Sequence, residues 1–251
     1  MSKRYSVVEV FPTLQGEGLW AGRACVFLRM AGCNMWNGRP EDRHKGQGAC
    51  AMWCDTDFAK GDPQSLPEVL ARLDAAWEQH GGGQSRRMVV ISGGEPTLQL
   101  DVALAKALKH EGWFTAIETN GTNDVDALSI IDHVCVSPKR GSTLQVWQAE
   151  ELKVVIPGGV RAALDEHQWS IEELLALAAQ GEWQHKFVQP QDVTDPTTVG
   201  VTELTRRLGH HEKIFRASEL YDQNVKRCVD FVSRHPDWRL SLQQHKYIGA
   251  R

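Results

Sequence analysis

Short apolar runs alternate with amphipathic segments along most of this 251-residue chain. The apolar runs predict strands at 24–30, 88–92, 114–118, 133–136, 152–156, 183–188 and 239–242. The amphipathic segments predict helices at 67–79, 102–110, 125–131, 171–179, 201–208 and 220–234. This alternation is typical of βα units, which build a parallel sheet through right-handed crossovers. Seven strands are slightly few for a closed eight-stranded barrel, so we expect an α/β fold with an open or incomplete βα barrel of mostly parallel strands.

Two of the predicted helices have a recognisable start. Ser65 precedes the first helix as a candidate N-cap, and Glu68 follows it three residues later as the partner in a capping box. Ser170 and Glu173 have the same spacing before the helix predicted at 171–179. These pairs fix where the two helices begin.

Chemically suggestive residues follow five of the predicted strands. They are Cys33 after the first strand, then 93–95, 118–120, 137–139 and 189–190 after the second, third, fourth and sixth. In βα barrels and related folds, functional groups gather at the carboxyl ends of the strands. The repeated coincidence predicts a site at this end of the sheet.

Three cysteines, Cys33, Cys50 and Cys54, lie within 22 residues of one another. Three thiolates can hold a [4Fe-4S] cluster and leave one iron without a protein ligand, where a cofactor can bind. Structural zinc is the alternative, but it needs four ligands, and His44 is the candidate that the insert offers as the fourth. The remaining cysteines lie in apolar contexts and are expected to be buried: Cys25, Cys135 and Cys228.

The bulk properties favour a cytoplasmic protein. The net charge of −4 gives no indication of a nucleic-acid or anionic-membrane partner. No apolar run reaches the roughly 20 residues of a membrane span. We see no secretion signal at the N-terminus, and in a reducing cytosol clustered cysteines more often bind metal than form disulfides.

Several motifs together resemble the radical S-adenosylmethionine (SAM) superfamily. The three-cysteine loop, with Trp53 before its last cysteine, is followed by the Gly-Gly-Glu-Pro run at 93–96. Within that superfamily, 13–18 (Thr-Leu-Gln-Gly-Glu-Gly), 29–34 and 54–56 resemble the 7-carboxy-7-deazaguanine synthases. Later segments extend the resemblance nearly end to end: 118–122, 136–139, 189–192 and 245–246. It implies a single radical SAM domain over 1–251.

The cysteine spacing departs from the superfamily pattern. That pattern is Cys-x3-Cys-x2-Cys, whereas here sixteen residues separate Cys33 from Cys50 and three separate Cys50 from Cys54. Some family members carry a long insert between the first two cysteines. We therefore interpret 36–49 as an insert in the cluster loop.

The resemblance implies a ring contraction: 6-carboxy-5,6,7,8-tetrahydropterin becomes 7-carboxy-7-deazaguanine with loss of ammonia, on the route to queuosine and other 7-deazapurines. The reaction breaks a C–H bond at an unactivated carbon, which side-chain acid–base chemistry cannot do but a cofactor radical can. The implied cofactors are a [4Fe-4S] cluster, SAM and Mg²⁺. SAM would be cleaved to a 5′-deoxyadenosyl radical and later regenerated, so no side chain is expected to be catalytic.

The resemblance also implies which residues bind each group. The cluster ligands are Cys33, Cys50 and Cys54, and Thr56 is the Mg²⁺ ligand. The implied SAM-binding residues are Trp53, Asp55, Gly93, Gly94, Glu95, Ser137, Pro138, Lys139, Gln189, Pro190, Gln191 and Asp192. The implied substrate-binding residues are Leu14, Gln15, Gly16, Glu17, Arg29, Asp55, Ser92, His245 and Arg251, the last through its terminal carboxylate.

The residue types suit these roles. Gly93 and Gly94 allow close approach of a backbone, and the amide and carboxylate of Gln15 and Glu17 match the donor–acceptor edge of a pterin. Arg29 can pair with the substrate carboxylate, although a structural ion pair would also explain a charge within an apolar strand.

Two other functions remain open from the sequence. One is a radical SAM activase that places a glycyl radical on a partner protein, although 15–18 and 54–56 favour the synthase. The other is a non-catalytic binding module stabilised by zinc. For the synthase, the family implies a homodimer and a reductant such as flavodoxin.

Overall fold

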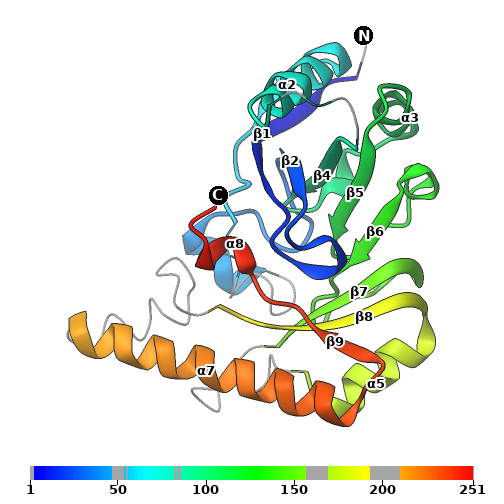
Figure 1. Cartoon of the computed structure of the whole chain (residues 1–251). Helices are drawn as coiled ribbons and strands as arrows, with labels where there is room; N and C mark the ends of the chain where they lie inside the picture. The colour runs from blue at the N-terminus through cyan, green and yellow to red at the C-terminus, as the bar shows by residue number, and fades with distance from the viewer. Residues whose placement is uncertain are drawn as a thin grey trace.

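The computed structural model describes residues 3–46, 54, 56–81, 83, 86–156, 169–192 and 210–250, with the backbone alone described at 43–44 and 210–220. In these described ranges, nine strands form one sheet: β1 (Tyr5–Leu14), β2 (Ala24–Met30), β3 (Asp62–Gln64), β4 (Met88–Gly93), β5 (Phe114–Thr119), β6 (His133–Val136), β7 (Gln148–Ile156), β8 (Glu182–Pro190) and β9 (Trp238–Leu240). Their order is β3-β1-β2-β4-β5-β6-β7-β8-β9 (Figure 1).

Seven of these strands, β2 and β4 to β9, are parallel and follow one another in chain order. This is the succession expected of βα units, and each of the seven predicted strands is present. Among the described strands, β3 and β9 form the two edges of the sheet. The expected open α/β sheet is therefore confirmed, and the carboxyl ends of its parallel strands lie along one rim.

The sequence pattern did not predict β1 and β3. Strand β1 pairs antiparallel with β2, with an irregularity between Val7 and Glu9, and it carries Pro12. A proline within a run argues against a strand unless the strand is near an edge or a bulge, and β1 meets that exception. Strand β3 is three residues long and contains Pro63, so no periodic pattern could reveal it.

The described helices are α2 (Leu66–Glu78), α3 (Val102–His110), α5 (Ile171–Gln180), α7 (His210–Arg234) and α8 (Gln244–Tyr247), with 3-10 turns η1 (Gly18–Trp20), η2 (Pro40–Lys45), η3 (Pro96–Leu98) and η4 (Asp126–Ile130). Both predicted capping boxes form, at Ser65 and at Ser170. The α-helix expected at 125–131 is wrong, because this segment is the 3-10 turn η4. The helix expected at 201–208 lies outside the described residues.

Buried aliphatic side chains join the sheet to its helices. Leu28 of β2 and Ile91 of β4 are fully buried in one cluster with Leu73 of α2 and Leu104 of α3. Each such side chain contributes about 1.5–3 kcal/mol through its removal from water. A second cluster joins β7, β8 and β9 to α5 and α7. Cys25, Cys135 and Cys228 are buried, as predicted.

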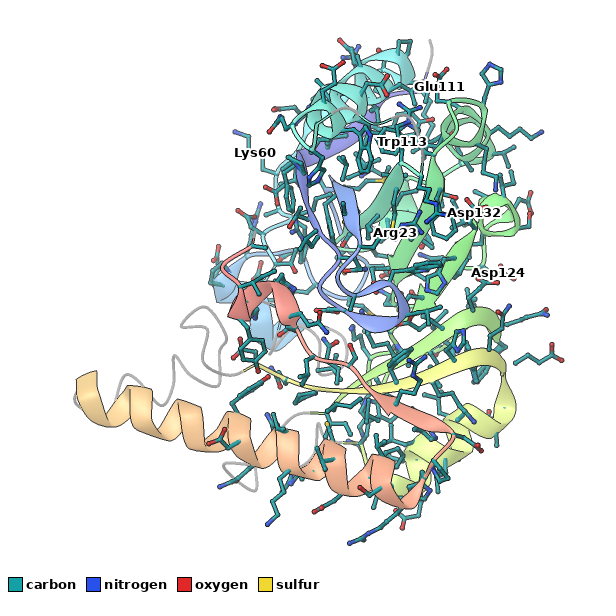
Figure 2. The ribbon with its side chains drawn as sticks, viewed as in Figure 1. Arg23, Lys60, Glu111, Trp113, Asp124 and Asp132 are labelled. Carbon is teal, nitrogen blue, oxygen red and sulfur yellow. The ribbon has the colours of Figure 1, made fainter. Side chains whose placement is uncertain are left out.

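The amino ends of the parallel strands are closed by aromatic and cationic side chains (Figure 2). The guanidinium of Arg23 lies 4.8 Å from the ring centroid of Trp20 and 4.6 Å from that of Phe114. The guanidinium of Arg87 lies 4.5 Å from the ring centroid of Trp113. These contacts stabilise the end of the sheet that is remote from the predicted site. Among the described helices, none is long and apolar enough to cross a membrane.

Candidate active site

A cavity of about 770 Å³ opens at the carboxyl ends of the parallel strands. Its wall contains eighteen of the residues that the sequence predicted for the site: Leu14, Gln15, Gly16, Glu17, Arg29, Cys33, Cys54, Thr56, Ser92, Gly93, Gly94, Ser137, Pro138, Lys139, Gln189, Gln191, Asp192 and His245. Glu95 and Pro190 are buried and do not line it. Cys50, Trp53, Asp55 and Arg251 lie outside the described residues.

Two of the predicted cluster ligands, Cys33 and Cys54, line this cavity together and are partly buried. The backbone N–H of Met35 donates to Sγ of Cys33 at 3.4 Å. Behind the two thiols, the rings of Trp36 and Phe58 meet edge to face with centroids 5.6 Å apart. This small apolar cluster shields one side of the thiols from water.

The glycines that end β4 lie against the segment that carries Cys33. Gly93 has a φ of +148°, and a Cβ there would come within 2.1 Å of the backbone oxygen of Met30. A Cβ on Gly94 would come within 2.3 Å of the backbone oxygen of Gly32 and 2.7 Å of Cβ of Cys33. Glycine is therefore required at both positions, because it lets β4 and the cysteine segment pack backbone to backbone.

Glu95 lies beneath the cavity wall and is completely buried. One carboxylate oxygen accepts hydrogen bonds from the N–H and the hydroxyl of Thr97 and from the hydroxyl of Thr119; the other accepts from the N–H of Asn120, at 2.7 Å. The amide of Asn120 in turn donates to Asn34, next to Cys33, at 3.0 Å. Glu95 thus links the ends of β4 and β5 to the cysteine segment.

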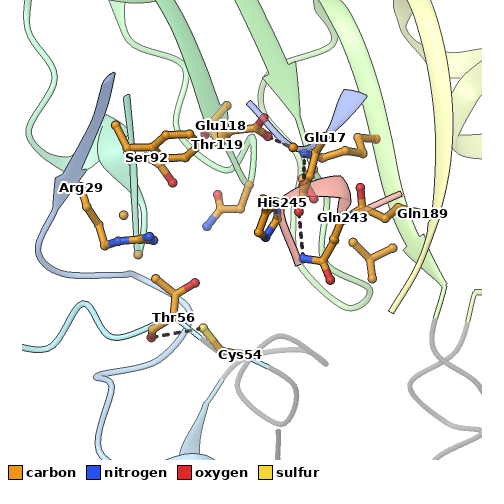
Figure 3. Close-up of a pocket in the computed structure, with 18 of the residues that line it drawn as sticks. Glu17, Arg29, Cys54, Thr56, Ser92, Glu118, Thr119, Gln189, Gln243 and His245 are labelled. Atoms are coloured by element: carbon orange, nitrogen blue, oxygen red, sulfur yellow. Dashed lines mark hydrogen bonds and ion pairs between the residues drawn. The ribbon is translucent and has the colours of Figure 1, made fainter. Parts of the chain in front are cut away.

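Arg29 on β2 faces the cavity beside Ser92, its register partner on β4 (Figure 3). Its Nε donates to Oε1 of Glu9 on β1 at 2.7 Å. The ion pair expected for an arginine in an apolar strand is therefore present, and the partly buried guanidinium still forms part of the cavity wall. Ion pairing and substrate binding by Arg29 are compatible in this geometry.

A buried ion cluster occupies the opposite wall. Nζ of Lys153 on β7, 3% exposed, lies 2.6 Å from Oε2 of Glu17 and 2.8 Å from Oε2 of Glu118 at the end of β5. Gln15 donates to the other oxygen of Glu118 at 3.2 Å, and Gln243 donates to the other oxygen of Glu17 at 2.9 Å. Figure 3 shows Glu17, Glu118 and Gln243 converging on this wall.

These contacts set the charge of the wall. Burial alone would raise the pKa of Glu17, but Lys153, Gln243 and His245 lower it to about 2. Burial alone would lower the pKa of Lys153, but the acidic side chains around it raise it well above its ordinary value. At neutral pH the wall therefore presents an ionised carboxylate at Glu17, paired with an ammonium group.

The C-terminal segment covers the loop that follows β1. The N–H of Gln244 donates to the backbone oxygen of Gly16 at 2.9 Å. A Cβ on Gly16 would come within 2.0 Å of Nδ1 of His245, so the imidazole lies directly on this glycine. His245 thereby lies over the Gln15–Glu17 loop and lines the cavity.

The wall near Lys139 carries polar groups on the ends of β6 and β8. Nζ of Lys139 donates to the hydroxyl of Ser137 at 2.9 Å, and the hydroxyl of Ser241 donates to the side-chain oxygen of Gln189 at 2.7 Å. Gln191 is buried, and within the described part of the chain neither polar atom of its side chain has a hydrogen-bond partner. Such an amide is suited to receive a polar ligand.

Comparison with known proteins decides the family. No family model matches the chain. The 7-carboxy-7-deazaguanine synthase of Burkholderia multivorans is 40% identical over 251 residues, covering 98% of each chain. Those of Bordetella pertussis and Caulobacter vibrioides are 41% and 37% identical, with the same coverage. The chain belongs to the 7-carboxy-7-deazaguanine synthase family.

A solved structure shares the fold of this chain. The crystal structure of QueE from Escherichia coli matches with a TM-score of 0.61 and 24% sequence identity, covering 96% of this chain and 95% of that one. The match agrees with the parallel open sheet described above. Both the family and the fold class expected from the sequence are thus confirmed.

Some residues of the synthase site were not given a binding role in advance. Glu118 belongs to 118–120, which the sequence placed at the functional rim, but no contact was assigned to it. Lys153 lies inside the apolar run 152–156, and a lone lysine there was a signal of the same kind as Arg29. Gln243 gave none, because its contact with Glu17 depends on how the C-terminal segment folds back.

The donor set fits the cofactors of a radical SAM enzyme. The cavity combines two thiols, a glycine pair at van der Waals contact with the cysteine segment, and the buried amide of Gln191. Thiolates are the usual ligands of iron–sulfur clusters, and amide, hydroxyl and ammonium groups suit the polar groups of SAM. Among the described residues, no group of three or more His, Cys, Asp or Glu could hold a metal ion, and Cys50 lies outside the residues searched.

Proposed function

We propose that this chain is a radical SAM lyase that converts 6-carboxy-5,6,7,8-tetrahydropterin to 7-carboxy-7-deazaguanine with release of ammonia. The observation that carries the proposal is that one cavity brings the Cys33 and Cys54 thiols together with Arg29 and the Glu17–Lys153 wall. The names of its relatives support the same product.

In this proposal Cys33, Cys50 and Cys54 hold a [4Fe-4S] cluster, which leaves one iron for SAM. When bound, cluster and SAM supply a carbon-centred radical able to remove a hydrogen from carbon. SAM would lie across the glycines that end β4, and its polar groups would reach the ends of β6 and β8. The candidate contacts are Trp53, Asp55, Gly93, Gly94, Glu95, Ser137, Pro138, Lys139, Gln189, Pro190, Gln191 and Asp192, with Glu95 and Pro190 acting from behind the wall.

The substrate would be held from two sides. Arg29 would bind its carboxylate, because Glu9 already fixes the orientation of the guanidinium. Gln15 and Glu17 would bind the donor–acceptor edge of the pterin, with Leu14, Gly16, Asp55 and Ser92 around the ring. His245 and the carboxylate of Arg251 would close the site and exclude water.

We further propose that Mg²⁺ binds at Thr56, beside Cys54, since hard cations prefer oxygen ligands (Figure 3). The family also supports a single radical SAM domain over 1–251 with the cluster-loop insert at 36–49, a homodimer, and reduction by a protein such as flavodoxin. Light scattering on the anaerobic protein tests the dimer, and turnover with and without added Mg²⁺ tests the metal.

The decisive assay incubates reduced, reconstituted protein with SAM and the carboxytetrahydropterin. We expect 7-carboxy-7-deazaguanine and ammonia in equal amounts from the parent and none from Cys33→Ala. Formation of 5′-deoxyadenosine only when a protein partner is added would instead support a glycyl-radical activase. Colourless protein with stoichiometric zinc would support a zinc-stabilised module.

A further inference from the structure

Strand β7 holds the loop that carries Glu17 through two side chains. Glu151 and Lys153 are two residues apart on the strand and therefore face the same side of it. Glu151, 1% exposed, accepts a hydrogen bond from the N–H of Leu19 at 3.0 Å. Gly18 has a φ of +65°, and a Cβ there would meet Glu151 at 2.1 Å. Lys153 then holds the side chain of Glu17 from the same strand.

We propose that Lys153 is a positioning and specificity residue, which keeps Glu17 an ionised hydrogen-bond acceptor and so selects a ring with adjacent N–H donors. The inference rests on the proposed function. Within the described part of the chain, each carboxylate oxygen of Glu17 has one donor, Gln243 or Lys153, and can accept a second hydrogen bond. The 2-amino group and N3–H of a pterin present two such donors side by side.

The charges around this pair explain why the lysine is needed. Glu118 on β5 and Glu151 on β7 also face Lys153, and Gln243 and His245 of the C-terminal segment face Glu17. Without the ammonium, Glu17 and Glu118 would be neighbouring, largely buried carboxylates, and like charges raise each other's pKa. A protonated Glu17 would place its O–H donor opposite the N–H donors of the pterin ring, where two donors cannot hydrogen-bond to each other.

The other titratable groups nearby do not replace Lys153. Burial, together with Glu118 and Glu151, raises the pKa of Cys135 well above its usual value, so it stays a neutral thiol at neutral pH. Nε2 of His133 lies 3.2 Å from Oε2 of Glu151, so the imidazole pairs with that carboxylate and not with Glu17 or Glu118. Among the described residues of this wall, Lys153 is therefore the cation paired with both Glu17 and Glu118, whereas His245 makes a smaller contribution to the lowered pKa of Glu17.

The test measures binding of 6-carboxypterin to reconstituted, SAM-loaded protein between pH 5.5 and 8, by ligand fluorescence, beside the turnover assay. For Lys153→Met we expect affinity at pH 6 to fall by about tenfold or more, since a charge-assisted acceptor becomes a donor, and to approach the parent value as pH rises. Lys153→Met/Glu118→Gln, which removes the second carboxylate, should recover most of the lost affinity at pH 6. Lys109→Met, at the far end of the sheet, is the control, and its binding should match the parent.

If Lys153→Met loses the same affinity at every pH, or loses none, the proposed role of Lys153 is wrong, even if the parent forms the product. If Lys153→Met does not fold, Lys153→Arg decides: it keeps the positive charge beside Glu17, so its affinity relative to the parent should be the same at pH 6 and at pH 8, and a loss confined to low pH overturns the inference. A parent that binds with the expected pH contrast but releases no product refutes the proposed reaction and leaves the role of Lys153 standing.

Discussion

The buried carboxylate of Glu95 provides the sharpest test of how the cysteine segment is held. In Glu95→Gln one oxygen becomes an amide NH₂ group. The side-chain oxygen of glutamine can keep the three donors from Thr97 and Thr119, and its NH₂ then faces the N–H of Asn120. One hydrogen bond is lost, and a buried donor is left opposite another donor.

The expected magnitude follows from these contacts. Losing a hydrogen bond to a carboxylate and leaving a buried donor unsatisfied should lower the free energy of unfolding by about 3 kcal/mol. For a chain of this size the midpoint of thermal unfolding should fall by about 6–12 °C. Because Asn120 also binds Asn34 beside Cys33, the iron retained after reconstitution should decrease as well.

Urea unfolding of the apoprotein, followed by circular dichroism and tryptophan fluorescence, measures the first effect. The two probes should agree if unfolding is two-state. Glu111→Gln is the matched control, because Glu111 is exposed at the surface (Figure 2), and it should change stability by less than about 0.5 kcal/mol. A Glu95→Gln protein as stable as this control would refute the reasoning.

Three further predictions concern the cavity wall. Gly94→Ala should lower both the iron content and the urea midpoint, because its Cβ would come within 2.3 Å of the backbone oxygen of Gly32. Gly83→Ala has open space around its Cβ and should change neither quantity. Equal iron content in the two variants would contradict this prediction. Arg29→Gln should raise KM for the carboxytetrahydropterin by about 10–100-fold, with a smaller effect on kcat, because a charged pair of hydrogen bonds to the substrate is lost. An unchanged KM would exclude Arg29 from binding the substrate carboxylate. The lowered pKa of Glu17, about 2 against 4.5, means that its stabilising contribution of about 3 kcal/mol is complete above pH 4.5 and is lost as pH falls toward 2. The difference in free energy of unfolding between the parent and Glu17→Gln, measured by urea unfolding, should therefore shrink from pH 6 to pH 2.5. A difference that grows as the pH falls would contradict the lowered pKa of Glu17.

Much of the fold could be predicted because the parallel strands are buried on both faces. Such strands appear as continuous apolar runs, and 133–136 and 24–30 coincide with β6 and β2. Strand β1 lies toward the antiparallel edge and carries Pro12, so its run was not recognised. The turn at 126–130 has apolar residues at helical spacing but ends after five residues, a length that periodicity cannot determine.

The candidate site also contains residues that the sequence could identify and residues that it could not. Residues in short local motifs, such as Cys33 and Gly94, could be identified because other residues of the same motif stand close to them in the sequence. Gln243 could not be identified, and the lone lysine at 153 gave a signal but no partner, because both side chains act through contacts across more than a hundred residues of sequence. Glu95 belongs to a motif, but its fully buried carboxylate and its link to Asn120 emerge only from the packing of β4 against β5.

The central claim is that thiolates at the rim of this sheet hold an iron–sulfur cluster. Anaerobic iron and sulfide analysis of the parent beside Cys33→Ala, Cys50→Ala and Cys54→Ala tests it most directly, with Cys228→Ala as the buried-cysteine control. We expect about four irons per chain in the parent and the control, and far fewer in the other three. Full iron content in any of those three variants, or stoichiometric zinc without iron in the parent, would contradict the account.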